Sequence, residues 1–135
     1  MTLVVDASVA LRWCFPLPGS DRAERLLTSG DRLIAPDLII AEVTNAVWKF
    51  ATFDHVEEDV ARSAVEQVIN AFEELVPIPD LRERALAIAI HQRHPAYDCF
   101  YLALAERYEA RLITADERLI RRCSSTRLKK LLRRL

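Results

Sequence analysis

Four acidic residues stand where a folded chain can use them for metal-dependent chemistry. Asp6 and Asp116 each follow a short run of strand-forming residues, and Glu42 and Asp98 each lie in the first turns of an apolar helix. Carboxylate oxygens are ligands that suit Mg²⁺ or Mn²⁺, which keep several waters and bind substrate phosphates. If the four carboxylates meet in one cleft, mutual repulsion raises their pKa values unless cations are present. The chemistry that this set predicts is hydrolysis of a phosphodiester bond by a metal-activated water.

Each of these acids also has an explanation that involves no catalysis. Asp6, Asp98 and Asp116 can each stabilise the N-terminus of a helix, and Glu42 can form a surface ion pair with Lys49. Helix capping and surface ion pairing explain each acid alone better than they explain the four acids together. On those explanations, the position of four acids around one edge of a sheet would be a coincidence.

Polar residues near the acids are candidates for a supporting role. Ser8 lies two residues after Asp6, Asn45 lies one helical turn after Glu42, and Thr114 ends the last strand-like segment. Hydrogen bonds from such groups orient metal ligands. We interpret His94, near Asp98, as a partly exposed loop residue, with contact to substrate as the alternative.

The pattern of apolar residues predicts strands and helices that alternate along the chain. Pro77 favours an edge position for the third strand, and Asp37 is the predicted N-cap of a long helix. The alternation predicts an α/β fold with a small parallel sheet, of four or five strands, covered by helices on both faces. Predicted strands cover residues 2–5, 33–35, 75–78 and 112–114; predicted helices begin at residue 7 and cover residues 20–29, 37–53, 55–74, 79–92, 98–105, 116–123 and 126–134.

Composition predicts one globular domain over residues 1–135. Hydrophobic residues make up 51% of the chain and charged residues 29%, as in soluble proteins. No apolar run approaches the ~20 residues that a membrane span requires, and the first residues lack the features of a signal peptide. The three cysteines lack the paired spacing of a zinc or redox motif. We therefore expect a cytoplasmic protein with reduced thiols and no membrane association.

The charges are unevenly distributed, although the net charge is only −1. Residues 118–135 contain eight Lys or Arg and no acid, whereas residues 54–83 contain nine acids and two arginines. The basic end favours binding to phosphate groups or to an acidic partner. The alternative is that it is simply a solvated helix face.

Four blocks of the sequence together resemble the motifs of PIN domains, and of VapC-type toxins of toxin–antitoxin pairs in particular. They occur in the right order and spacing along the chain, and the set is specific although no single block is diagnostic. The blocks are LVVDAS (residues 3–8), AEVTNA (41–46), AYDCFYLALA (96–105) and LITADERL (112–119).

The resemblance implies an endoribonuclease that depends on Mg²⁺ or Mn²⁺, forms a homodimer and is silenced by a cognate antitoxin. It implies a three-layer PIN-like fold. Many relatives end with a short fifth strand, whereas residues 126–135 here have a basic, helical pattern. The resemblance assigns metal binding to Asp6, Glu42, Asp98 and Asp116, and supporting positions to Ser8, Asn45 and Thr114.

The basic end of the chain acquires a specific role under this resemblance. A metal site holds one scissile phosphate, so binding an RNA strand requires further cations along its backbone. Arg118, Arg121 and Arg122 follow Asp116 closely and are the candidates for RNA binding.

Other functions remain open on the sequence. A PIN nuclease of RNA processing without a toxin role, or an inactive binding module, would share these blocks. An aspartyl-phosphate enzyme with Asp6 as nucleophile is less favoured, because such sites require a second Asp where Ser8 stands. A receiver-type signalling module is also less favoured, because no paired acids end the first strand and no Lys follows the last.

Overall fold

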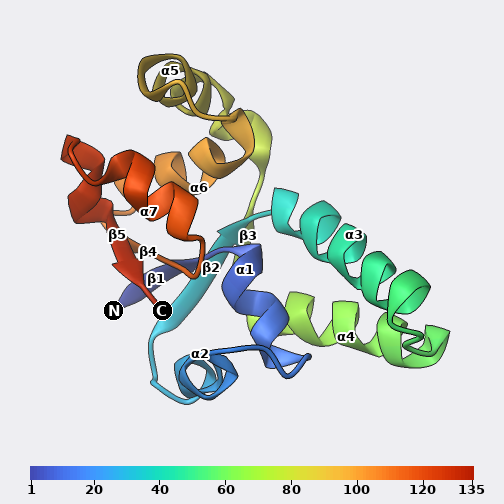
Figure 1. Ribbon diagram of the computed structural model, residues 1–135. Coiled ribbons are helices and arrows are strands. Elements are labelled where there is room, and N and C mark those ends of the chain that lie inside the picture. Colours follow the sequence, from blue (N-terminus) through green and yellow to red (C-terminus); the bar gives the residue numbers. More distant parts are fainter.

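A parallel five-stranded sheet forms the centre of the molecule, which we describe over residues 1–135 from a computed structural model (Figure 1). The strand order is β3-β2-β1-β4-β5, so β1 is central and β3 lies at one edge, as Pro77 predicts. The predicted parallel α/β fold is confirmed. The strands are β1 (Thr2–Val5), β2 (Arg32–Pro36), β3 (Glu74–Val76), β4 (Arg111–Thr114) and β5 (Leu132–Arg134).

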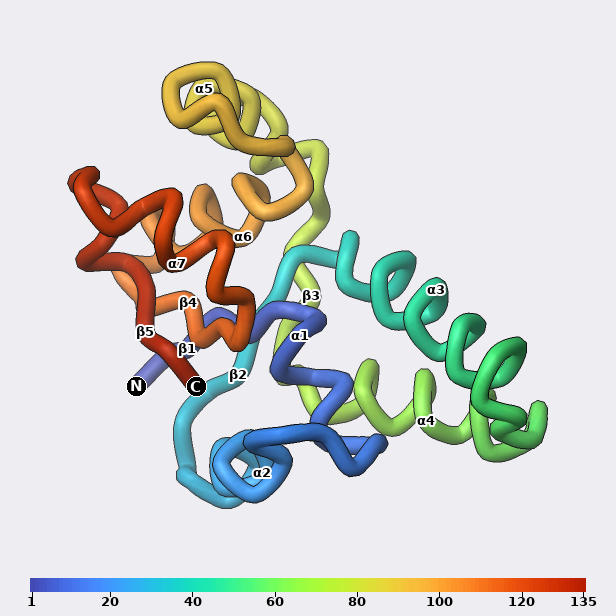
Figure 2. The backbone as a smooth tube through the Cα atoms, viewed as in Figure 1, coloured from blue at the N-terminus to red at the C-terminus, as the bar shows by residue number.

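Seven α-helices flank this sheet. Helix α6 packs against β1, β2 and β4, whereas α1 contacts β4 and α3 contacts β2. Helix α5 packs on α6 rather than on the sheet, and α3 and α4 extend side by side away from it (Figure 2). None of the helices combines the length and the apolar character that crossing a bilayer requires. The helices are α1 (Ala7–Ala10), α2 (Ser20–Leu27), α3 (Leu38–Phe53), α4 (Glu58–Ala71), α5 (Arg82–Gln92), α6 (Ala96–Arg107) and α7 (Glu117–Cys123).

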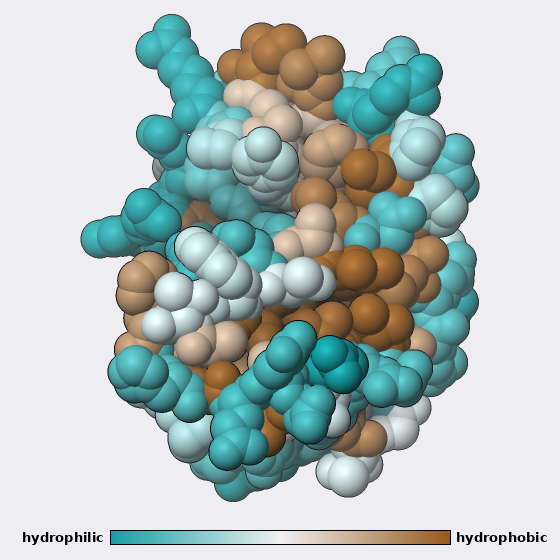
Figure 3. All heavy atoms as spheres, turned by 90° about the vertical axis from the view of Figure 1, so that its right-hand side faces the viewer, coloured by the Kyte–Doolittle hydropathy of each residue, from teal (hydrophilic) through white to brown (hydrophobic).

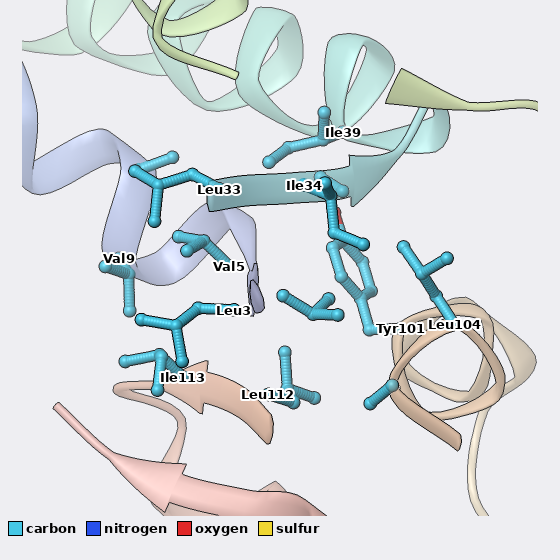
Figure 4. Packing of buried hydrophobic residues seen from close by; sticks show 14 of the residues in the cluster. Leu3, Val5, Val9, Leu33, Ile34, Ile39, Tyr101, Leu104, Leu112 and Ile113 are labelled. Atoms are coloured by element: carbon cyan, nitrogen blue, oxygen red, sulfur yellow. The ribbon is translucent and has the colours of Figure 1, made fainter. Parts of the chain in front are cut away.

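Helix α6 is the most deeply buried helix. Its residues 101–105 and Cys99 are all buried, which matches the apolar character of this segment on nearly every side. Tyr101 and Leu104 lie against Ile34 of β2 in the core (Figure 4). Burial of so much apolar surface holds the helix firmly on the sheet, so a side chain in its first turn has a well-defined position.

The predicted helix over residues 126–134 is wrong. Residues Arg127–Leu131 form a 3₁₀ turn, and the chain then becomes β5. The reason is tertiary: β5 pairs with β4, with Leu132 opposite Leu112, and satisfies backbone groups that would otherwise form an open edge. This pairing outweighs the local helical pattern.

Two further local predictions also differ from the structure. The helix predicted over residues 55–74 is shorter, because α4 covers only Glu58–Ala71 and β3 already begins at Glu74. Asp37 is the N-cap residue of α3, as predicted, but its side chain makes no capping hydrogen bond, because its carboxylate accepts from the Ile78 amide at 3.1 Å instead. Asp37 therefore connects β2 to the chain that follows β3.

Candidate active site

The candidate site lies at the point in the strand order where successive strands stop being added on one side of β1 and begin to be added on the other. The connections from β1 to β2 and β3 run to one side of β1, and β4 and β5 lie on the other. In parallel sheets, ligands bind beyond the carboxyl ends of the strands at such a switch point. Asp6 directly follows β1, and Asp116 follows β4 by two residues. Local sequence therefore places both acids at this edge.

Asp6 is buried, with 7% of its surface exposed, and accepts three hydrogen bonds. Its Oδ1 accepts from the Ser8 hydroxyl at 2.5 Å and from the Val9 amide at 3.2 Å, and its Oδ2 accepts from the Thr114 hydroxyl. An ionised carboxylate offers about four acceptor positions, so Oδ2 retains one for a cation. Burial, with a smaller contribution from the nearby Asp98 carboxylate, raises the pKa of Asp6 to about 6 despite these hydrogen bonds.

Two of the predicted supporting residues connect the turns after β1 and β4. The Ala115 amide donates to the Ser8 hydroxyl oxygen, and the Asp116 amide donates to Thr114 Oγ1, each at 3.0 Å. Because both hydroxyls also donate to Asp6, each couples Asp6 to the backbone of the second turn. Asn45 is different, since it is exposed and makes no hydrogen bond to any of the four acids.

Asp116 acts as the N-cap of α7. Its Oδ1 accepts from the amides of Arg118 at 2.9 Å and Leu119 at 3.4 Å. The capping explanation therefore applies to this residue, as it does to Asp6 at α1. Capping occupies only Oδ1 of Asp116, so its second carboxylate oxygen has no partner within the chain.

Glu42 is held by a tyrosine that the sequence analysis did not select. The hydroxyl of Tyr101 donates to Glu42 Oε1 at 2.6 Å, so Tyr101 and not Lys49 is the partner of Glu42. Partial burial raises the pKa of Glu42, the Tyr101 hydrogen bond opposes this, and the carboxylates of Asp98 and Asp6 raise it further. The sequence does contain one signal that could have identified Tyr101: it lies three residues after Asp98, and so on the same side of α6.

Asp98 contacts His94 from the preceding loop. The distance from His94 Nε2 to Asp98 Oδ2 is 2.6 Å, and the side chains are 12% and 30% exposed, respectively. His94 lies in a loop and is partly exposed, as predicted, and it also contacts an acid of the candidate site. Asp98 is thus held by one neighbour and remains open to solvent.

An open cleft of about 630 Å³ lies in front of Asp98 and Asp116. No apolar side chain other than Pro95 borders it, and the three arginines proposed for RNA binding do. The structure therefore brings a negatively charged floor and a positively charged rim together in one cleft. The lining residues are His94, Pro95, Asp98, Asp116, Arg118, Arg121 and Arg122.

Residues 3–124 match the PIN domain. The chain belongs to the PIN-domain family. This PIN domain is 34% identical over 121 residues to Ribonuclease VapC3 of Pyrobaculum aerophilum, a match that covers 88% of this chain and 92% of that protein. The family and its VapC type are therefore confirmed, as the four sequence blocks predict.

Solved structures agree with the fold of this PIN domain. The crystal structure of PAE2754 from Pyrobaculum aerophilum has a TM-score of 0.71 and 26% identity, over 90% of this chain and 79% of that one. A toxin–antitoxin complex from Klebsiella pneumoniae has a TM-score of 0.68 at 16% identity, over 93% of each chain. The second likeness concerns the fold alone.

The acids of this PIN domain fit a hydrated divalent ion better than a fully protein-coordinated one. No three His, Cys, Asp or Glu side chains converge closely enough to hold a metal ion by themselves. Burial raises the pKa of both Asp6 and Glu42, and the Asp98 carboxylate adds to the rise in each, as Asp6 does for Glu42, so these carboxylates interact across a short space. Mg²⁺ binds through one or two carboxylates and retains several waters, which matches this oxygen-only set.

Proposed function

We propose that this VapC-type PIN domain is a metal-dependent endoribonuclease and the toxin of a toxin–antitoxin pair. The observation that carries the proposal is the electrostatic coupling of Asp6, Glu42 and Asp98 at the switch point of the sheet. Carboxylates whose pKa is raised by burial and by a neighbouring carboxylate, as for Asp6 and Glu42 near Asp98, are stabilised in their charged form by a bound cation. The similarity to a protein named as a ribonuclease, over 88% of this chain, supports RNA as the substrate.

Asp6, Glu42, Asp98 and Asp116 would hold the ion. When bound there, Mg²⁺ or Mn²⁺ would supply Lewis-acid chemistry, activation of a water and offsetting of charge on the leaving oxygen. Ser8 and Thr114 keep the Asp6 carboxylate in a single orientation, and Tyr101 does the same for Glu42. Asn45 has no such contact, so its supporting role stays a prediction.

The rim arginines act on the substrate rather than on the acids. Arg118, Arg121 and Arg122 border the same cleft as His94, Asp98 and Asp116. Arg122 is also anchored, because its Nη2 donates to the Arg93 carbonyl oxygen at 3.1 Å. We assign these side chains to the phosphates on either side of the bond that is cut, where cations offset the charge of the RNA backbone.

An antitoxin is the proposed protein partner, and the groove between α3 and α4 is its docking site. The groove has a volume of about 670 Å³ and is lined by Val47, Trp48, Ala61, Val65 and Ile69 among others. Apolar surface is visible across this face of the molecule (Figure 3). Trp48 is 53% exposed, and solvent-exposed apolar patches of this kind mark protein-binding sites. The fold is shared with the toxin–antitoxin complex from Klebsiella pneumoniae.

Homodimer formation is proposed through α5. Leu86 and Ile90 of this helix are 57% and 70% exposed, although both are large and apolar. Their burial against a second copy would remove that surface from water. The dimer and the cytoplasmic location both stay predictions.

A cleavage assay tests the enzymatic proposal. Purified protein incubated with RNA and Mg²⁺ or Mn²⁺ is expected to cut the RNA, and both EDTA and Asp6→Asn are expected to abolish cleavage. Cleavage that neither change affects would reject the metal mechanism. Expression without a partner should arrest growth; harmless expression of an active nuclease would instead favour a role in RNA processing.

A further inference from the structure

A second groove, with a volume of about 850 Å³, lies between α5 and the C-terminal segment of the chain. No residue of this groove belongs to the set that the proposed reaction uses. Its walls come from one face of α5, at intervals of three and four residues, and from the 3₁₀ turn before β5. The residues that matter below are Arg84, Ile88 and His91 of α5, and Arg127, Lys130 and Leu131 of the turn.

The walls of this groove continue the walls of the acidic cleft. On one side, Gln92 at the end of α5 lines the groove, and His94, two residues later, lines the cleft. On the other side, Arg122 of α7 lines the cleft, and Ser125, three residues later, lines the groove. The Arg122 hydrogen bond to the Arg93 carbonyl joins the two sides at this junction. The cleft and the groove therefore follow one another along the same pair of chain segments.

The groove has a net positive charge. Its one carboxylate, Glu106, is neutralised by Arg84, whose Nε and Nη2 donate to the two carboxylate oxygens at 2.7 and 2.9 Å. Arg127 and Lys130 are exposed and form no ion pair. Two cations are thus free to bind an anion, beside apolar surface from Ile88 and Leu131.

We propose that this groove binds the backbone of the RNA substrate on one side of the bond that is cut. The inference rests on the proposed function and extends it, because it places a flanking part of the strand that the acidic cleft does not hold. Arg127 and Lys130 contact successive phosphates, while the apolar wall accommodates the sugars and bases between them. The groove continues the acidic cleft, so a single RNA strand can pass from Arg118, Arg121 and Arg122 directly into the groove. This favours a nucleic acid over an acidic peptide as the ligand.

The test compares a long single-stranded RNA with a tetranucleotide that fills only the acidic cleft. The wild-type chain is expected to have a higher kcat/KM for the long RNA. In the variant Arg127→Gln/Lys130→Gln, the ratio of the two kcat/KM values should fall about tenfold at low salt, through KM. In an Asp98→Asn background, which leaves RNA uncut, the salt dependence of log Kd for the long RNA should decrease by about 1.4, the value for two single-strand phosphate contacts.

A matched control carries the same charge change at the other end of the molecule. Lys49→Gln/Arg25→Gln removes two exposed cations from α3 and α2 and should leave both kcat/KM values and the salt dependence unchanged. The groove inference is rejected if the groove variant behaves like this control. It is also rejected if an acidic peptide, but not RNA, protects the groove residues from chemical modification. Neither result affects the proposal that the protein is a nuclease. If neither substrate is cut with either metal, the proposed function itself fails.

Discussion

The hydroxyl of Tyr101 on α6 donates to Glu42 Oε1 on α3 across 2.6 Å, joining two helices whose contacting residues are 59 positions apart in the sequence. Tyr101 is only 1% exposed, so its hydroxyl has no access to bulk water. A buried hydroxyl needs a partner, and here the partner is one of the candidate metal ligands. A residue of the protein core thus directly orients one of the four candidate acids.

Tyr101→Phe is expected to reduce activity more than stability. The substitution keeps the ring in the core but removes the donor that orients Glu42, and a hydrogen bond to a charged group contributes about 1.5 kcal/mol, or roughly tenfold in rate. The measurement is kcat and the Mn²⁺ concentration at half-maximal activity. Tyr108→Phe is the matched control, because the Tyr108 hydroxyl donates to Glu74 at 3.2 Å, away from the cleft. Equal effects of the two variants would contradict a positioning role for Tyr101.

His94→Ala is expected to weaken metal binding about tenfold, the lower end of what the loss of an outer-shell partner costs. His94 Nε2 lies 2.6 Å from Asp98 Oδ2, and the loss of this contact leaves the carboxylate free to rotate. Calorimetric titration with Mn²⁺ measures the change directly. His94→Gln places an amide near the same position and should restore part of the affinity. Unaltered affinity in the alanine variant would show that His94 only packs against α6.

Asp6→Asn is expected to stabilise the metal-free protein above pH 6. Burial raises the folded-state pKa of Asp6 from 3.8 to about 6, so the folded state binds this proton more tightly than the unfolded state does. The resulting stability is fully present below about pH 4 and is lost as the pH rises through 6. The loss is on the order of 2–3 kcal/mol.

Urea unfolding in EDTA checks this expectation. The unfolding midpoint of the wild-type protein should fall between pH 4 and 6, and that of Asp6→Asn should change less over the same interval. Addition of Mg²⁺ at pH 7 should raise the midpoint of the wild type but not that of the variant. A variant that is less stable than the wild type at pH 7 would show that Asp6 serves mainly as a helix cap.

Thr114→Val is expected to lower both stability and activity. Thr114 is fully buried, and its hydroxyl donates to Asp6 Oδ2 and accepts from the Asp116 amide. Valine has nearly the same shape but leaves a buried carboxylate without one donor, at a cost of about 2 kcal/mol. Thr114→Ser retains the hydroxyl and should recover most of the loss in urea midpoint at pH 7. Failure of serine to do so would point to packing rather than hydrogen bonding.

The sequence by itself determined the class of fold and the positions of the acids along it. Short β-branched runs alternating with helical periodicities predict a parallel sheet, because side-chain polarity and backbone preference are local properties. Asp6 and Asp116 follow strands, so the edge of the sheet on which they lie is also predictable. The same local logic explains why the resemblance to PIN domains is readable in four separate blocks.

Only the tertiary structure decided which groups the acids contact. Thr114 meets Asp6 across 108 residues, and Tyr101 meets Glu42 across 59. The C-terminal residues form β5 against β4 even though their own pattern is helical. In each case the deciding interaction joins residues far apart in the chain, and its free energy depends on burial and pairing that exist only after the sheet has assembled.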